Sequence, residues 1–411
     1  MKKDILVRAP ALSMSGYGEQ ARFLLRALAN REDVEIYLKN TPWGSSGNIT
    51  EYTKETDWIK SLIAKTSKKF REDENFRPEM SVQVTIPNEW ENLADINIGY
   101  TAGIECDRVS PSWIEKANFM NKVVTISQHS EDVFKNTHYD VLNNEDDEVV
   151  AELKLKTPID HVGYGARQTI RDKNFKLDLP TDFNFLTVAQ LGPRKNIEVL
   201  MKSFLGAFQN NEKVGLIIKG FSKNNSISDK KRSREMIKSI TNQYPNRKCK
   251  IYLLHGEMSR RELTSLYKHS SVKSYITTTH GEGFGLPIFE AASAGLPVVA
   301  PNWSGHKDFL NFSGHEELFC EIPFYLDEVS KESRWPGVIE DDARWSYVKE
   351  EDVSKSMNNM YENYKKYKRK AGILKKNILR DYNEKDKLTE LSEKILNVNT
   401  TTNKQKGEEK T

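Results

Sequence analysis

The stretch HGEGFGLPIFEAASAGLPVVAP, residues 280–301, places Glu282 among glycines and Glu290 inside an otherwise apolar segment. The preceding VKSYITTT is β-branched and aromatic, which is typical of a strand. After it, Pro287 begins a short helix that Gly295 ends, and PVVA is typical of another strand. Both acids therefore belong to a strand-to-helix turn. In open α/β sheets ligands bind at the carboxyl ends of parallel strands, and helix N-termini attract anions.

Composition sets the broad class of the protein. The chain has 411 residues, 37% of them hydrophobic, which is enough for two or three packed domains. Its 62 lysines and arginines nearly balance 59 acids, and the net charge is only +3. Global charge therefore does not indicate a nucleic-acid or membrane-surface binder. We expect a multi-domain globular protein.

The cysteines and the hydropathy pattern indicate the compartment. Cys106, Cys249 and Cys320 are odd in number and far apart, as expected of reduced thiols rather than a disulfide framework. The N-terminal MKKDILVRAP has too short an apolar run for a signal peptide, and no segment reaches the length of a transmembrane helix. These features predict a cytoplasmic location.

Strand and helix patterns alternate along the chain, which predicts an α/β fold with two doubly wound, Rossmann-like domains. We expect an N-terminal domain over 1–168, with an acidic surface insertion at 143–156, and a linker over 169–182. A second domain is expected over 183–375.

The C-terminal part is predicted to be helical. Five apolar or aromatic residues form a helical stripe: Val353, Met357, Met360, Tyr364 and Tyr367. A further helix over 376–396 is expected to pack back on the N-terminal domain. The polar tail 397–411 lacks periodicity and is predicted to be disordered.

The residue types around the two acids suit a sugar nucleotide. A carboxylate accepts hydrogen bonds from two neighbouring hydroxyls, as sugars and riboses present them. Gly283 and Gly285 let the backbone approach a ligand, and the N–H groups of residues 284–286 could face a phosphate. The alternative is that Glu290 only complements the helix dipole, Glu282 is solvated and the glycines form a turn.

The pattern E-G-F-G-L-P-x-x-E followed by A-x-x-A-G-x-P-V-V resembles the signature of family 4 retaining glycosyltransferases, down to the seven residues between the acids. The resemblance implies the GT-B fold, in which an N-terminal acceptor domain and a C-terminal donor domain face across a cleft. It implies that Glu290 accepts the ribose hydroxyls and Glu282 the hydroxyls of the transferred sugar. The assisting amides would be those of Phe284, Gly285 and Leu286.

The turn AQLGPRKN carries the predicted cations. The resemblance aligns Lys195 with a family lysine that binds the donor diphosphate, and places Gln190 where the family has an arginine. Arg194 could supply the missing cation from a neighbouring position, or Gln190 could contribute only a hydrogen bond. Two basic residues on a solvated turn are the simpler alternative.

The N-terminal loop SMSGYGEQAR contains Gly16-x-Gly18-x-x-Ala21, a weak match to a dinucleotide fingerprint. The second strand ends in Lys39 and Asn40 without a ribose-binding acid, which argues against a nicotinamide site. In the resembled family a glycine-rich loop here faces the donor phosphates, and this role is assigned to Gly16 and Gly18. An ordinary loop and helix cap is the alternative.

The segment GYTAGIECDRVSPSW resembles an acceptor-side segment of a subgroup of these enzymes. Many other members have a histidine there, which this chain lacks. Glu105 is the candidate for contacting the acceptor or the transferred sugar, and a structural salt bridge with Arg108 is the alternative.

The sequence carries no H-E-x-x-H, D-x-D, G-x-S-x-G or Walker pattern, so we expect no metal and no cofactor besides the nucleotide-sugar substrate. The basic run YENYKKYKRKAGILKK (361–376) could touch nucleic acid or an anionic membrane, or be an exposed helix face.

The resemblance predicts a metal-independent retaining hexosyl- or pentosyltransferase. Its acceptor, whether a glycan, a lipid-linked glycan, a protein or a modified nucleic-acid base, is not readable from the sequence. An epimerase-like enzyme of this fold and a non-catalytic sugar- or nucleic-acid-binding protein remain alternatives.

Overall fold

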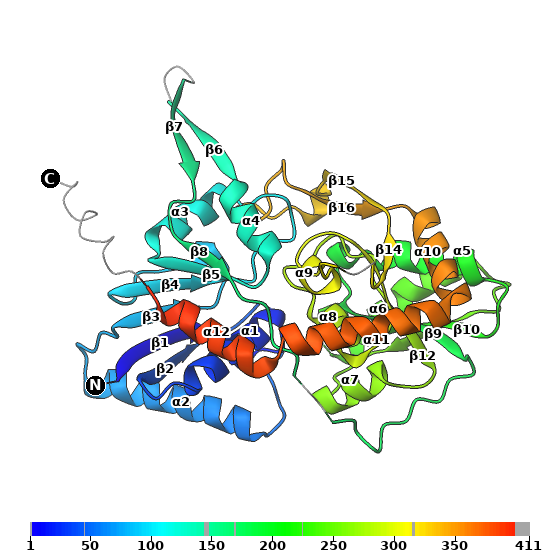
Figure 1. Cartoon of the computed structure of the whole chain (residues 1–411), viewed down its shortest axis with the longest axis horizontal. Coiled ribbons are helices and arrows are strands. Elements are labelled where there is room, and N and C mark those ends of the chain that lie inside the picture. The colour runs from blue at the N-terminus through cyan, green and yellow to red at the C-terminus, as the bar shows by residue number, and fades with distance from the viewer. Residues whose placement is uncertain are drawn as a thin grey trace. The chain divides into compact units, whose positions relative to one another are not determined.

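A computed structural model gives the fold of the chain (Figure 1) and describes residues 2–44, 46–143, 148–167, 170–223, 225–314 and 317–398. The tip of the expected acidic insertion, 144–147, and the tail from residue 399 lie outside the described residues. The chain forms two compact units, neither continuous in sequence. Unit 1 comprises Met1–Gly165, Val329–Ala343 and Glu384–Thr411, and unit 2 comprises Ala166–Glu328 and Arg344–Asn383.

Unit 1 is built on a parallel six-stranded sheet with the order β2-β1-β3-β4-β5-β8. Its strands are β1 (Lys3–Ala9), β2 (Val34–Asn40), β3 (Met80–Gln83), β4 (Ile96–Tyr100), β5 (Lys122–Thr125) and β8 (Ile159–His161). Its helices are α1 (Gly16–Ala29), α2 (Lys54–Glu72), α3 (Pro111–Phe119), α4 (Gln128–Asn136) and α12 (Glu384–Leu396), with short 3₁₀ turns η1 (Pro87–Glu89) and η3 (Lys331–Ser333). The central strands β1, β3, β4 and β5 are largely buried on both faces, as parallel strands covered by helices should be, whereas the edge strand β8 is only half-buried.

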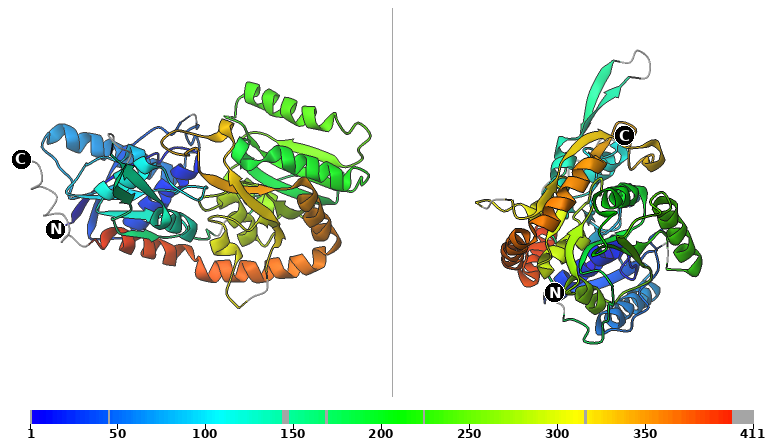
Figure 2. Two further views of the ribbon diagram at one scale, coloured as in Figure 1. Left: turned by 90° about the horizontal axis from the view of Figure 1, so that it is seen from above. Right: turned by 90° about the vertical axis from the view of Figure 1, so that its right-hand side faces the viewer.

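Unit 2 has a second parallel sheet, with the order β11-β10-β9-β12-β13-β14. Its strands are β9 (Phe183–Gln190), β10 (Val214–Phe221), β11 (Lys250–Leu254), β12 (Val272–Ile276), β13 (Val298–Pro301) and β14 (Cys320–Ile322). Its helical elements are η2 (Pro193–Lys195), α5 (Ile197–Phe208), α6 (Ile227–Thr241), α7 (Arg260–Tyr267), α8 (Leu286–Ala294), α9 (Lys307–Leu310), α10 (Glu350–Glu362) and α11 (Tyr364–Asp381). Figure 2 shows α6 on one side of this sheet and α11 on the other.

The strand order places a topological switch point in each unit. In unit 2 the chain passes from β9 outward to β11 and then returns to β12 on the other side of β9. The turns that follow β9 and β12 therefore leave the sheet side by side in opposite directions, which is where ligands bind in open α/β sheets. The predicted doubly wound α/β class is confirmed.

The C-terminal helices differ from the expected ones. The stripe from Val353 to Tyr367 is divided between α10 and α11, because the helix is interrupted at Asn363. The helix expected over 376–396 is likewise the end of α11 followed, after Tyr382 and Asn383, by α12. Within unit 1, α12 is held by ion pairs of Glu384 with Arg26 at 3.6 Å and of Lys394 with Asp160 at 2.9 Å.

Several elements have no counterpart in the sequence analysis. Among them are α2, α3, α6, β8, β14 and the antiparallel pair of β15 (Phe324–Glu328) with β16 (Arg344–Val348). The acidic insertion is part of a β-hairpin, in which β7 (Val149–Lys154) pairs with β6 (His138–Leu142). Its alternating polar and apolar residues carry no turn glycine, so periodicity alone did not identify it.

The two glycines at the start of α1 differ in their surroundings. Ser15 caps the helix by accepting a hydrogen bond from the Gly18 N–H at 3.1 Å. A Cβ on Gly18 would lie 2.0 Å from the Ser13 carbonyl oxygen, whereas a Cβ on Gly16 would meet nothing within 4 Å. Close packing of the loop therefore requires glycine at 18 and does not require it at 16.

We predict that Gly18→Ala lowers the free energy of unfolding by about 2 kcal/mol, because the loop must move away from the new methyl group. Gly16→Ala is the matched control and should change stability by less than about 1 kcal/mol. Denaturant unfolding of both variants checks this. Equal stabilities would contradict the packing of Ser13 on Gly18.

Candidate functional site

Two turns meet at the switch point of unit 2. The turn after β9 contains Arg194 and Lys195, and the turn after β12 contains Glu282. Their backbones are joined, because the His280 N–H donates to the Arg194 carbonyl at 2.9 Å. The Thr278 hydroxyl donates to the carbonyl of Asn196, also at 2.9 Å.

Glu282 is the centre of a buried charge cluster. Glu282 is 7% exposed, and each of its two carboxylate oxygens is paired with a different cation. Lys195 pairs with Oε1, and Arg194 Nη1 lies 3.0 Å from Oε2. The same Arg194 nitrogen donates to the Gly281 carbonyl at 2.5 Å. The interpretation of Glu282 as a solvated acid is therefore wrong. The side chain of Lys195 is 13% exposed, and that of Arg194, which keeps more contact with solvent, is 31% exposed.

The charge state of Glu282 follows from its partners. Burial raises the pKa of the Glu282 carboxyl, but attraction from Lys195 and Arg194 and their hydrogen bonds outweigh burial and lower it to about 2. Glu282 is therefore ionised at neutral pH. Two cations surround one carboxylate, so the three side chains together carry a charge of +1.

The segment after β13 holds the backbone of Glu282. The Ser304 hydroxyl accepts a hydrogen bond from the Glu282 N–H at 2.8 Å, and the Gly305 N–H donates to the Glu282 carbonyl at 2.9 Å. Ser304 has a φ of 69°, which is uncommon for a residue other than glycine. A Cβ on Gly305 would lie 1.9 Å from the Gly283 carbonyl oxygen. Sequence reasoning assigned no role to Ser304 or Gly305, although both lie in the NWSGHKDFL segment that follows the next strand.

Glu290 lies in the second turn of α8. This helix begins at Leu286 after Gly285, whose φ of 90° suits glycine, and ends at Gly295 with a φ of 83°. Glu290 is half-buried and accepts a hydrogen bond from the Tyr267 hydroxyl at 3.3 Å. Tyr267 is on α7 and was not identified from the sequence, because a tyrosine in an amphipathic helix is most simply a core residue.

The residues between the two acids differ in burial, and this decides which of their groups can reach a ligand. Phe284 is buried in an aromatic cluster with Phe289, Phe309 and Tyr382. Its side chain is therefore not available to a ligand, and only its backbone can serve one. Gly283 and Leu286 are half-buried in the turn.

His280 is fixed on the other side of Glu282. Its ring stacks on Trp345 of β16 with centroids 4.6 Å apart and planes 8° apart, and its Nδ1 donates to the Ser346 carbonyl at 2.6 Å. Burial lowers the pKa of His280, so the imidazole is neutral at physiological pH. The β15–β16 pair thus supports the turn that carries Glu282.

Gln190 is exposed at the end of β9, and its Nε2 donates to the Ser222 carbonyl at 3.1 Å. The side chain that contacts Glu282 from this turn, besides Lys195, is Arg194.

The three sequence-predicted residues of the first domain belong to unit 1. Gly16 and Gly18 open α1, and Glu105 is half-buried in the loop after β4. Next to them the Tyr17 hydroxyl lies 2.8 Å from Thr101 Oγ1. Burial and the nearby Glu105 raise the pKa of Tyr17. Arg108, the alternative partner of Glu105, forms an ion pair with Asp342.

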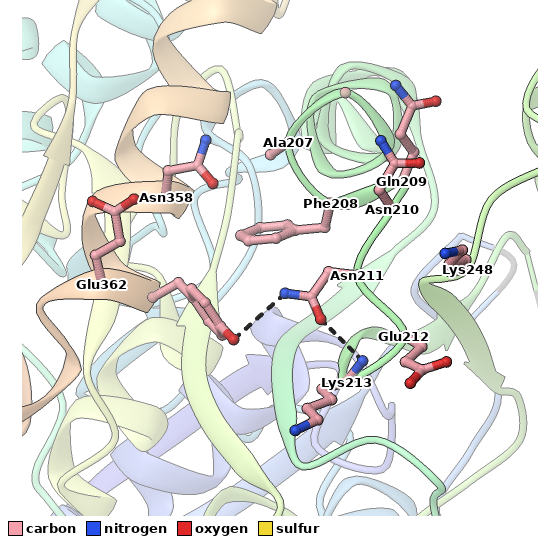
Figure 3. Close-up of a pocket in the computed structure, with 12 residues that line it drawn as sticks. Ala207, Phe208, Gln209, Asn210, Asn211, Glu212, Lys213, Lys248, Asn358 and Glu362 are labelled. Carbon is pink, nitrogen blue, oxygen red and sulfur yellow. Dashed lines mark hydrogen bonds between the residues drawn. The ribbon is translucent and has the colours of Figure 1, made fainter.

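A separate pocket of about 580 Å³ lies in unit 2 where α5 ends and β10 begins (Figure 3). Its lining includes Gln209, Asn211, Asn358 and Tyr361. Because it adjoins the amino end of β10, it is distinct from the turns that carry Glu282 and Lys195. None of the catalytic or donor-binding residues predicted from the sequence lines this pocket.

The residues that the structure describes contain neither a membrane-spanning helix nor a cluster of metal ligands. No helix there is long and apolar enough to cross a membrane. In the same residues, no group of three histidine, cysteine or acidic side chains is arranged to hold a metal ion.

Comparisons with known proteins agree with this geometry. Residues 169–315 match the family described as glycosyl transferases group 1, a range that includes both turns of the charge cluster and Glu290. No curated protein matches the chain.

Solved structures match nearly the whole chain. Anabaena HepE, solved with UDP and glucose, has a TM-score of 0.56 at 15% identity over 95% of this chain and 98% of its own. Sucrose-phosphate synthase from Thermosynechococcus elongatus has a TM-score of 0.64 at 12% identity over 95% and 98%. A UDP-forming α,α-trehalose-phosphate synthase from Burkholderia xenovorans has a TM-score of 0.59 at 11% identity over 97% and 99%.

At these identities the solved structures establish the fold, and the family model matches the segment that holds the charge cluster. The chain thus has the GT-B fold of glycosyltransferases, and its residues 169–315 match the group 1 glycosyl transferases.

Proposed function

We propose that this protein is a retaining glycosyltransferase that moves a sugar from a nucleotide diphosphate sugar to an acceptor hydroxyl. The observation that carries the proposal is the buried Glu282 with its two cations, at the switch point of the unit that matches group 1 glycosyl transferases. A solvated turn needs no such cluster.

Lys195 and Arg194 would bind the donor diphosphate. Their cluster with Glu282 has an excess positive charge, which attracts an anion, and the same charge stabilises the diphosphate as it leaves. Gln190 stands where the resembled family has an arginine, and Arg194 would supply that positive charge instead. A guanidinium has five N–H donors, enough to keep Glu282 and reach a phosphate oxygen.

The two acids would divide the donor between them. Glu290, held by Tyr267, would accept the ribose hydroxyls, and Glu282 the hydroxyls of the transferred sugar. The amides of Phe284, Gly285 and Leu286 would assist. In unit 1, the loop with Gly16 and Gly18 would serve the donor phosphates and Glu105 the acceptor side.

The proposed reaction keeps the anomeric configuration. The bond from the anomeric carbon to the diphosphate oxygen breaks, and the acceptor oxygen bonds to that carbon from the face that the diphosphate leaves. The acceptor proton passes to an oxygen of the departing phosphate. The side chains position the donor and stabilise negative charge, so we propose that the reaction needs no metal ion.

The direct test is a screen of the purified protein with a panel of nucleotide sugars, with and without EDTA. UDP-glucose comes first, because Anabaena HepE was solved with it. Release of the nucleoside diphosphate with acceptor glycosylation supports the proposal, and NMR of the product decides retention. Donor isomerisation without transfer would identify an epimerase-like enzyme. Absence of nucleotide binding in calorimetry would indicate a non-catalytic protein.

We predict that Lys195→Ala and Arg194→Ala each reduce kcat about 100-fold or more, because each removes a cation from the leaving group. Lys202→Ala is the control, since Lys202 pairs with Glu198 on the outer surface of α5. It should leave kcat within about twofold. Steady-state kinetics of the three variants decide this, and normal turnover of Lys195→Ala would remove the site assignment.

Tyr267→Phe should weaken binding of the nucleoside diphosphate by about three- to tenfold, because Glu290 loses the hydroxyl that orients it. The control is Tyr275→Phe, which removes another buried hydroxyl, one that donates to the Val188 carbonyl at 3.3 Å. Calorimetric titration should show weaker binding in the first variant alone. Equal affinities would assign Tyr267 a purely structural part.

The pKa of Glu282 predicts an acid dependence that does not require activity. The carboxyl binds its proton near pH 4.5 in the unfolded chain and near pH 2 in the folded one. Below pH 4.5 the unfolded state therefore binds more protons, and stability falls as the pH decreases toward 2. The lost contribution is roughly 3 kcal/mol.

Glu282→Gln should therefore be less stable than the natural protein at neutral pH, with a difference that shrinks between pH 5 and 2. Denaturant unfolding at several pH values measures it. A pH-independent difference would show that Glu282 is not held by Lys195 and Arg194, whatever the protein catalyses.

A further inference from the structure

Helix α11 carries a basic face that the proposed function does not use. Its 18 residues include eight lysines and arginines and one acid, Asp381. The core side of the helix is formed by the buried Tyr367, Ala371, Leu374 and Ile378. Opposite them the exposed cations follow at helical spacing: Lys365, Arg369, Lys376 and Arg380. We call these four residues the α11 basic face.

The α11 basic face is long and nearly straight. At 1.5 Å per residue its first and last cations are about 22 Å apart along the helix axis. Between them Ile373 is 36% exposed. Of the four cations, Arg380 is paired with the neighbouring Asp381 at 2.7 Å, and it is the end of the row.

A second row of lysines lies beside this face. Lys368 and Lys375 of α11 lie near Lys273 of β12 and Lys268 at the end of α7. Lys368 is held in place, since its Nζ donates to the Gly295 carbonyl at 2.9 Å. Burial lowers the pKa of Lys268 and of Lys368, and the charged neighbours that add to this shift are cations. Such a cluster of like charges attracts anions.

The tyrosines of this run pack against the core of unit 2, Tyr367 as a buried residue and Tyr361 and Tyr364 as half-buried ones. Tyr367 is buried and its hydroxyl accepts a hydrogen bond from Asn359 Nδ2 at 2.9 Å. Tyr364 packs edge-on against Phe183, with ring centroids 5.4 Å apart, and Tyr361 does the same at 4.9 Å. The rings that base stacking with a single-stranded nucleic acid would need are therefore packed against the core, and none of the three tyrosines is exposed. The α11 basic face offers lysine and arginine charge and one partly exposed aliphatic side chain, that of Ile373.

We propose that the α11 basic face, with the adjacent lysine row, docks this protein on an anionic lipid bilayer. The apolar side of α11 is committed to the core of unit 2, so the contact is electrostatic and peripheral rather than inserted. A straight row of lysine-rich charge fits a planar anionic surface, to which each cation adds attraction. None of these residues belongs to the charge cluster of Glu282, so the two functions can be tested separately.

The test is sedimentation of the full chain with vesicles of phosphatidylcholine alone or with 30% phosphatidylglycerol. We expect binding only to the anionic vesicles, and its loss at 0.5 M NaCl, where screening is strong. The variant Lys365→Glu, Arg369→Glu, Lys376→Glu should bind at least about 100-fold more weakly. Replacing the same three residues by glutamine should give an intermediate loss and covers the case in which the glutamate variant does not fold.

The matched control is Lys230→Glu, Lys231→Glu, Arg234→Glu on α6, another exposed basic helix of the same unit. It makes the same change in net charge and should bind within about threefold of the natural protein. Unchanged binding of the α11 variants, equal loss in the α6 variant, or equal binding to neutral vesicles would each overturn the proposal. Tighter binding to duplex DNA than to anionic vesicles would also overturn it, in favour of a nucleic acid.

Discussion

A carboxylate buried at the turn after β12 must be paired, and this requirement organises the second unit. Taking an isolated carboxylate out of water costs several kcal/mol, so Glu282 is tolerated only with cations beside it. Lys195 and Arg194 supply them from the turn after β9. The strand order makes these two turns neighbours, and the Ser304–Gly305 segment after β13 holds the backbone that carries the acid. Three strand ends thus converge on one charge.

The same cluster connects the fold to the proposed chemistry. A net positive, preorganised group of side chains at a switch point is suited to an anionic ligand, and a diphosphate is the anion in the reaction that we propose. The second acid, Glu290, is oriented separately by Tyr267. The α11 basic face lies outside this arrangement and is the part of the molecule that we relate to location rather than catalysis.

Much of the fold and part of the site could be predicted from the sequence. Both sheets follow from β-branched runs alternating with amphipathic helices, and α8 from Pro287 and Gly295. The break at Asn363 was missed because the apolar stripe continues across it at nearly the same spacing. Helices α2 and α6 were missed because polar residues occupy several of their buried positions, Thr56 and Thr66 in α2 and Asp229 and Ser233 in α6, so neither helix shows an unbroken apolar stripe. Tyr267 could not be found, since a hydrogen-bonding tyrosine and a core tyrosine have the same periodicity.

The sequence by itself determined the class of fold, the two strand-to-helix turns with their acids and cations, and the resemblance to glycosyltransferases, because these depend on local pattern and spacing. Only the tertiary structure decided which of these groups touch. Glu282 is 87 residues from Lys195, and their pairing arises from the return of β12 to the side of β9. The structure also decided that Arg194 contacts Glu282 while Gln190 is exposed, and that the tyrosines of α11 face inward while its lysines face outward. Burial and contact depend on the whole sheet, and no single stretch of sequence contains them.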